Sequence, residues 1–125
     1  MRDALLVALG GATGSVLRWW LAGLTQRASG GGAFPWGTLA VNVAGSLAIG
    51  VVAALGMGRV PLPAASRLLI VTGVLGGFTT FSALSIETFT LLRQGQTGMA
   101  AAYAIGSLAA GLVATWAGWS LAARG

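Results

Sequence analysis

Long apolar stretches separated by short polar connectors make up this sequence. Each stretch is about as long as the roughly 20 residues that a helix needs to cross a lipid bilayer. The stretches cover residues 4–24, 36–57, 68–92 and 99–123. The first is longer than the apolar region of a signal peptide, so we expect it to be a retained helix. The pattern predicts an all-α membrane protein with one transmembrane domain, residues 1–125, of four helices.

The third apolar stretch differs from the others because small and polar residues interrupt its middle. Residues 73–90 read GVLGGFTTFSALSIETFT, which combines glycines, hydroxyl side chains and an acid. Lipid offers no hydrogen bonds to an exposed backbone, so this segment is either a helix with close small-residue contacts or a broken helix. The composition favours a third helix broken near its middle. Breaks of this kind bind ions through freed carbonyl and N–H groups.

Polar side chains lie four or eight residues apart in the second and fourth stretches, so each set shares one helix face. They are Thr38, Asn42 and Ser46 in the second stretch, and Tyr103, Ser107 and Thr115 in the fourth. An isolated hydroxyl in a membrane helix usually bonds its own backbone, but two aligned rows favour a polar track. The Asn42 amide either joins two helices or faces an anion path as a donor without fixed charge.

Other candidate groups in the predicted spans are two charged residues and the phenylalanines. Glu87 is either a proton or cation site, or it forms a structural hydrogen bond to Ser85 or a nearby backbone group. Arg18 either extends to the membrane interface or lines an ion entrance. The phenylalanines are most simply packing residues, although an electropositive ring edge can face an anion.

Composition narrows the possible functions. Only 7% of residues are charged, against about a quarter in soluble domains, and there is no cysteine or histidine. Asp3 and Glu87 are the only carboxylates. Hydrolytic and metal-dependent catalytic sites therefore lack their usual groups, and we expect no enzyme. The seven positive residues are scattered arginines, so we expect no nucleic-acid binding.

The arginines are almost evenly divided between the two sides of the membrane. With four spans, the side of the two termini holds Arg2, Arg59, Arg67 and Arg124, and the other side holds Arg27 and Arg93, with Arg18 near a helix end. The weak bias allows insertion in either direction. Two oppositely inserted copies could form an antiparallel, dual-topology homodimer, an arrangement that resembles the inverted repeats of transport proteins.

Three motifs together resemble the CrcB/Fluc family of fluoride channels. They are GGATGSVLRWW (10–20), WGTLAVNVAGSLAIG (36–50) and GVLGGFTTFSALSIET (73–88), and the resemblance covers nearly the whole chain. It implies passive, fluoride-selective export through an antiparallel homodimer in the inner (plasma) membrane. It also implies a structural sodium ion at the dimer centre, held by the backbone carbonyls of Gly76 and Thr79.

The resemblance also implies a set of residues along the fluoride pathway. These are Arg18, Asn42, Phe81, Ser82, Glu87, Tyr103, Ser107 and Thr115. Two positions depart from the family pattern. Ala83-Leu84 stands where the family has threonine and a second phenylalanine, and Gly111 interrupts the hydroxyl row where a serine is often found.

Two other functions remain open at this point. A small antiparallel multidrug exporter driven by protons would match the size, span number and charge balance. It should carry an essential acid within its first helix, where this chain has only Asp3 at the terminus. A non-transporting assembly subunit is the third possibility, but it has no need for two aligned polar faces.

Overall fold

The computed structural model describes residues 1–58 and 61–124, and the regular structure in these ranges is entirely helical. Four helical segments are long and apolar enough to cross a membrane: Arg2–Ala28, Trp36–Gly56, Ala64–Arg93 and Thr97–Ala123. This confirms the prediction of an all-α chain with four candidate membrane-spanning helices. Arg59, which entered the comparison of arginines on the two sides, lies outside the described residues.

Three of the spans are single helices, whereas the third consists of several pieces. The single helices are α1 (Arg2–Ala28), α2 (Trp36–Gly56) and α6 (Thr97–Ala123). The third span contains α3 (Ala64–Arg67), the π-helix η1 (Leu68–Leu75), α4 (Gly76–Phe78) and α5 (Phe81–Arg93). The first and third spans extend furthest beyond their predicted bounds, because their helical turns continue through polar residues at the ends.

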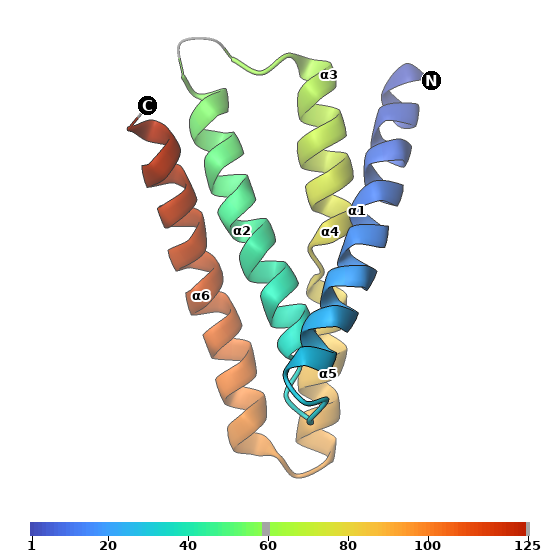
Figure 1. Cartoon of the computed structure of the whole chain (residues 1–125), viewed down its shortest axis with the longest axis vertical. Helices are drawn as coiled ribbons and strands as arrows, with labels where there is room; N and C mark the ends of the chain where they lie inside the picture. The colour runs from blue at the N-terminus through green and yellow to red at the C-terminus, as the bar shows by residue number, and fades with distance from the viewer. Residues whose placement is uncertain (59–60, 125) are drawn as a thin grey trace.

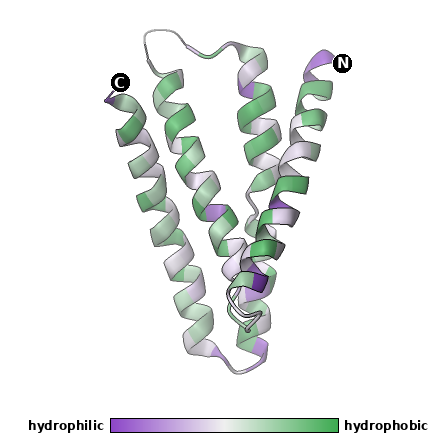
Figure 2. Ribbon diagram, viewed as in Figure 1, coloured by the Kyte–Doolittle hydropathy of each residue, from purple (hydrophilic) through white to green (hydrophobic). Residues whose placement is uncertain are grey.

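The arrangement of the spans forms two pairs (Figure 1). α1 lies beside η1 and α4, and α2 lies beside α6, with both helices of the second pair running in the same direction. The beginnings of α1 and α3 and the ends of α2 and α6 lie at one end of the molecule, as expected for four spans. Figure 2 shows apolar residues along most of each helix, with isolated hydrophilic positions inside α1 and α2.

Glycines allow the first pair to approach backbone to backbone. A Cβ atom at Gly10 would overlap the carbonyl oxygen of Leu69, and one at Gly77 would overlap that of Gly11. Gly14 has no room for a Cβ either, because Val74 and Phe78 backbone atoms lie against it. We call this contact the α1 seam.

A second set of glycines brings α2 against α6, and we call that contact the α2–α6 seam. A Cβ at Gly50 would overlap the carbonyl oxygen of Thr115, and one at Gly118 would overlap that of Leu47. Near the N-terminal ends of α2 and α6 lies a small core in which Tyr103 is fully buried beside Leu91 and Ala100. Phe34 meets the Tyr103 ring edge-on, with centroids 5.5 Å apart, in a favourable aromatic geometry.

A single side chain holds the glycine-rich connector between α1 and α2. The Gln26 amide nitrogen donates to the carbonyls of Gly32 and Phe34, at 3.0 and 3.1 Å. The Gln26 carbonyl oxygen accepts from the backbone N–H of Gly37 in the first turn of α2, at 3.1 Å. Gln26 therefore provides hydrogen-bond partners for backbone groups that have none within a helix.

Candidate ion-handling site

Helical geometry stops at Phe78 in the third span and resumes at Phe81. Between them, Thr79 (φ −80°, ψ 155°) and Thr80 (φ −151°, ψ 116°) are extended. The Thr80 hydroxyl accepts a hydrogen bond from the backbone N–H of Ala83 at 3.1 Å, so Thr80 is the N-cap of α5. Threonine is one of the residues preferred at this position, which explains why the helix begins again here.

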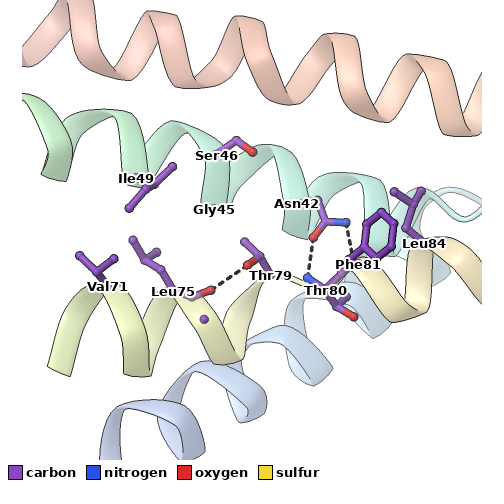
Figure 3. Close-up of a pocket in the computed structure, with 11 residues that line it drawn as sticks. Asn42, Gly45, Ser46, Ile49, Val71, Leu75, Thr79, Thr80, Phe81 and Leu84 are labelled. Atoms are coloured by element: carbon purple, nitrogen blue, oxygen red, sulfur yellow. Dashed lines mark hydrogen bonds between the residues drawn. The ribbon is translucent and has the colours of Figure 1, made fainter. Parts of the chain in front are cut away.

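The Asn42 side chain on α2 binds the extended backbone at Thr80 from both of its polar atoms (Figure 3). Its carbonyl oxygen accepts from the Thr80 N–H at 2.8 Å, and its amide nitrogen donates to the Thr80 carbonyl at 3.1 Å. The amide therefore takes the place of a backbone partner at membrane depth, where unpaired peptide groups are costly. Because an amide nitrogen carries two hydrogens, one donor of Asn42 is left for a ligand.

The same hydrogen bonds release two backbone carbonyls in the third span. In a continuous α-helix, Gly76 would accept from the N–H of Thr80 and Thr79 from that of Ala83. Those N–H groups instead donate to the Asn42 side chain and to the Thr80 hydroxyl. The two freed carbonyls belong to the residues that the family resemblance assigns to sodium, and carbonyl oxygens are suitable ligands for such a hard cation.

A groove of about 410 Å³ runs between α2 and the third span at this point. Its lining includes Asn42, Ser46, Gly76, Thr79 and Phe81. The Phe81 side chain is 80% exposed, so within one chain its ring has few contacts. The groove therefore brings together the predicted pathway residues Asn42 and Phe81 with the predicted sodium ligands.

A second polar cluster surrounds Glu87 on α5. One carboxylate oxygen accepts from the Thr38 hydroxyl at 2.8 Å, and the other accepts from the Tyr103 hydroxyl at 2.6 Å. The prediction of a structural hydrogen bond to Ser85 or to a nearby backbone group is therefore wrong, because both donors belong to other helices. A pocket of about 350 Å³, lined by Gln26, Gly37, Thr38 and Glu87 among others, opens beside this cluster.

The remaining predicted pathway residues lie apart from the groove. Ser107 is buried, and its hydroxyl has no hydrogen-bond partner among the described residues. Thr115 lies at the α2–α6 seam, where its carbonyl meets Gly50. Ser82 is exposed at the start of α5, with its hydroxyl 3.3 Å from that of Thr80, and Arg18 is partly buried on α1. The described residues of one chain thus place the predicted set around the groove, along the seam and near Glu87, rather than in one cavity.

Sequence reasoning missed the roles of two residues. Thr80 both caps α5 and presents the backbone groups that bind Asn42, and the preference of threonine for N-caps was the available signal. Gln26 holds the first connector through three hydrogen bonds. No local pattern indicates that role, because its partners lie several residues away along an irregular loop.

Comparison with known proteins gives a consistent result over nearly the whole chain. Residues 5–119 match the family described as "CrcB-like protein, Camphor Resistance (CrcB)". A relative from Opitutus terrae is 52% identical over 116 residues, covering 91% of this chain and 87% of its own. Relatives from Thermus thermophilus and Methylobacillus flagellatus are 50% and 47% identical over 121 residues, covering 97% of this chain and 95% and 94% of their own. All three relatives are named "Fluoride-specific ion channel FluC".

Proposed function

The chain belongs to the CrcB family, and from this premise we propose that it is a fluoride-selective channel through which fluoride leaves the cell passively. The observation that carries the proposal is the identity of about one half, over nearly the full chain, with relatives named fluoride channels. The prediction that the chain is not an enzyme is confirmed by the same family. With its four candidate spans it is a multi-pass membrane protein, and we propose that it lies in the inner (plasma) membrane.

The polar groups of the chain fit the chemistry of this ion. Fluoride is small and strongly hydrated, so a pathway must replace its water shell with closely spaced hydrogen-bond donors. The second N–H of Asn42 and the hydroxyl of Ser107, which has no partner among residues 1–58 and 61–124, are neutral donors within the spans. Neutral donors can replace water without trapping the anion as a fixed positive charge would.

We further propose that the channel is an antiparallel, dual-topology homodimer. The groove beside the interrupted helix and the exposed ring of Phe81 offer a surface for a second copy. The near-equal arginine distribution permits opposite insertion of the two copies. In this arrangement, the pathway runs between groups of the two chains, in agreement with the separate locations of the polar residues in one chain.

A structural sodium ion fits the carbonyls of Gly76 and Thr79. Both have lost their usual N–H donors, and both residues line the groove on which we place the second copy. Two carbonyls are too few for a hard cation, which prefers about six oxygens, but a site on the dimer axis receives the same pair from each chain. The bound sodium would supply positive charge that balances the freed carbonyl dipoles and joins the two copies.

Halide efflux from reconstituted vesicles tests the proposed function. We expect rapid fluoride efflux and little chloride efflux, at the same rate with and without a proton gradient. Equal fluoride and chloride rates would contradict fluoride selectivity. Transport that requires the proton gradient would instead favour the small multidrug exporter.

The dimer and its sodium ion need separate measurements. Because the chain has no cysteine, a single cysteine in place of the exposed Gln94, at the start of the α5–α6 connector, can be labelled from outside intact cells with an impermeant reagent. Dual topology predicts labelling of about half of the molecules, whereas full or zero labelling contradicts it. Light scattering of the purified protein should give a dimer mass, and replacement of sodium by a large organic cation should lower its thermal stability.

A further inference from the structure

The hydroxyl row on α6 has a gap at Gly111. Tyr103, Ser107 and Thr115 present hydroxyls on one helix face, but Gly111 has no side chain. Ser107 and Thr115 are two helical turns apart, a rise of about 12 Å. A hydroxyl donor reaches an acceptor only to about 3 Å, so α6 alone leaves an ion without a donor across this gap.

The α2 helix places a serine opposite the gap. α2 and α6 run in the same direction. Residues four apart on α2, such as Ser46 and Gly50, face residues four apart on α6. At one end of the pair, Thr38 and Tyr103 both reach Glu87, and further along Gly50 meets Thr115. Between these two levels the Ser46 hydroxyl lies 3.3 Å from where a Cβ of Gly111 would be.

The space at this level is tight for a second hydroxyl-bearing side chain. A contact of 3.3 Å is closer than most Cβ contacts, so a serine at Gly111 would crowd Ser46. Figure 3 draws the Ser46 hydroxyl at the edge of α2 nearer to α6. Ser46 is only partly buried, and among residues 1–58 and 61–124 its hydroxyl is in no hydrogen bond.

We propose that Ser46 supplies from α2 the fluoride donor that the α6 row lacks at Gly111. The ligand is the anion itself, which accepts a hydrogen bond from the neutral hydroxyl. This inference rests on the proposed fluoride conduction and assigns a further binding residue to that pathway. It predicts that the donor is required at this level of the membrane but that either helix can carry it.

Fluoride efflux from vesicles that contain purified variants tests this proposal. Ser46→Ala removes the hydroxyl and keeps the Cβ, and we expect a roughly three- to tenfold lower rate, the effect of one ordinary hydrogen bond. The double variant Ser46→Gly with Gly111→Ser moves the hydroxyl to α6 and should regain most of the wild-type rate. Its matched control, Ser46→Gly with Gly111→Ala, exchanges the same bulk without a hydroxyl and should stay slow.

Further controls separate the inference from the proposed function. Ser120→Ala, near the end of α6, should conduct like the wild type, and a dimer mass by light scattering shows that each variant assembles. If Ser46→Ala gives too little protein, Ser46→Cys, with similar volume and a weak donor, takes its place with the same expected loss. A wild-type protein that releases no fluoride would overturn the proposed function and this inference with it.

With a conducting wild type, two outcomes would overturn the inference alone. In the first, Ser46→Ala conducts at the wild-type rate. In the second, the two double variants conduct equally, so that bulk rather than the hydroxyl decides the rate. Recovery by the serine exchange and not by the alanine exchange supports it.

Discussion

The α1 seam and the α2–α6 seam use the same device and differ in one respect. Both rely on glycines whose missing side chains let one backbone touch the next. In the α1 seam the facing positions are glycine or apolar, as at Gly10 and Gly73. In the α2–α6 seam, Gly118 likewise faces the apolar Leu47, but Gly111 faces the Ser46 hydroxyl and Gly50 faces the backbone of the hydroxyl-bearing Thr115. Small residues therefore let the helices approach closely in both seams. The hydroxyl-bearing residues of the α2–α6 seam distinguish it from the apolar α1 seam.

The largest expected effect is the loss of the scaffold on substitution of Gly14 by alanine. The new Cβ would overlap the Val74 carbonyl and lie 2.8 Å from the Phe78 nitrogen, and backbone atoms cannot turn aside as a side chain can. Overpacking usually costs about 1–3 kcal/mol, so we expect a destabilisation of about 3 kcal/mol or more. The thermal unfolding midpoint in detergent and the yield of monodisperse protein measure it.

Gly11→Ala is the matched control in the same helix. Its Cβ would meet nothing within 4 Å, and alanine is the better helix former. We expect a midpoint equal to that of the wild type or slightly higher. Equal midpoints for the Gly14 and Gly11 variants would show that the α1 seam is not closely packed.

Asn42→Asp should abolish fluoride flux while the dimer persists. The carboxylate can still accept from the Thr80 N–H, but it cannot donate to the Thr80 carbonyl or to an anion. It also adds a negative charge that repels fluoride, so we expect a fall of about 100-fold or more in efflux. Light scattering provides the control for assembly, and an unchanged flux would count against both the role of Asn42 and the fluoride assignment.

Tyr103→Phe should lower fluoride efflux by a smaller amount, roughly three- to tenfold. The substitution keeps the ring that packs on Phe34 and removes only the hydroxyl that donates to Glu87. Loss of a hydrogen bond to a charged group leaves one carboxylate oxygen unpaired and free to rotate. Efflux at the wild-type rate would mean that this hydroxyl serves packing alone.

The smallest expected effect belongs to Thr38→Val, which removes the other donor to Glu87. We expect efflux to fall about threefold, because Tyr103 still holds the carboxylate. Thr90→Val is the matched control, since the Thr90 hydroxyl is exposed and bonds the Ile86 carbonyl in its own helix. If Thr38→Val and Thr90→Val conduct fluoride at the same rate, the hydrogen bond from Thr38 to Glu87 contributes no more to conduction than a hydroxyl elsewhere in the chain.

The number of spans and their approximate ends could be read from the sequence. An apolar run of the length of a bilayer has few alternatives, because lipid requires every backbone group to be paired within the helix. The sequence could not show how the third span divides into α-helical, π-helical and extended parts. That division depends on α1 and α2, which supply the close contact at Gly10 and the hydrogen bonds from Asn42.

The sequence indicated which polar residues could form the candidate site, but it could not show which of them contact one another. Four-residue spacing indicated two polar faces, yet it could not show that Asn42 binds Thr80 or that Glu87 binds Thr38 and Tyr103. Those bonds join residues far apart in the chain. Their formation depends on how the helices are rotated, which periodicity does not determine. The arrangement across two copies stays a prediction for the same reason.

The common direction of α2 and α6 has an electrical consequence. Their N-terminal ends lie at one end of the molecule, and each carries about half a positive charge from aligned peptide dipoles, with the opposite charge at the other end. In one chain α1 and the third span run in the opposite direction and offset part of this field, but the different sequences of the two pairs leave the two faces of the membrane unlike. Two copies inserted in opposite directions make the faces equivalent, so the channel that we propose should pass current equally well in both directions.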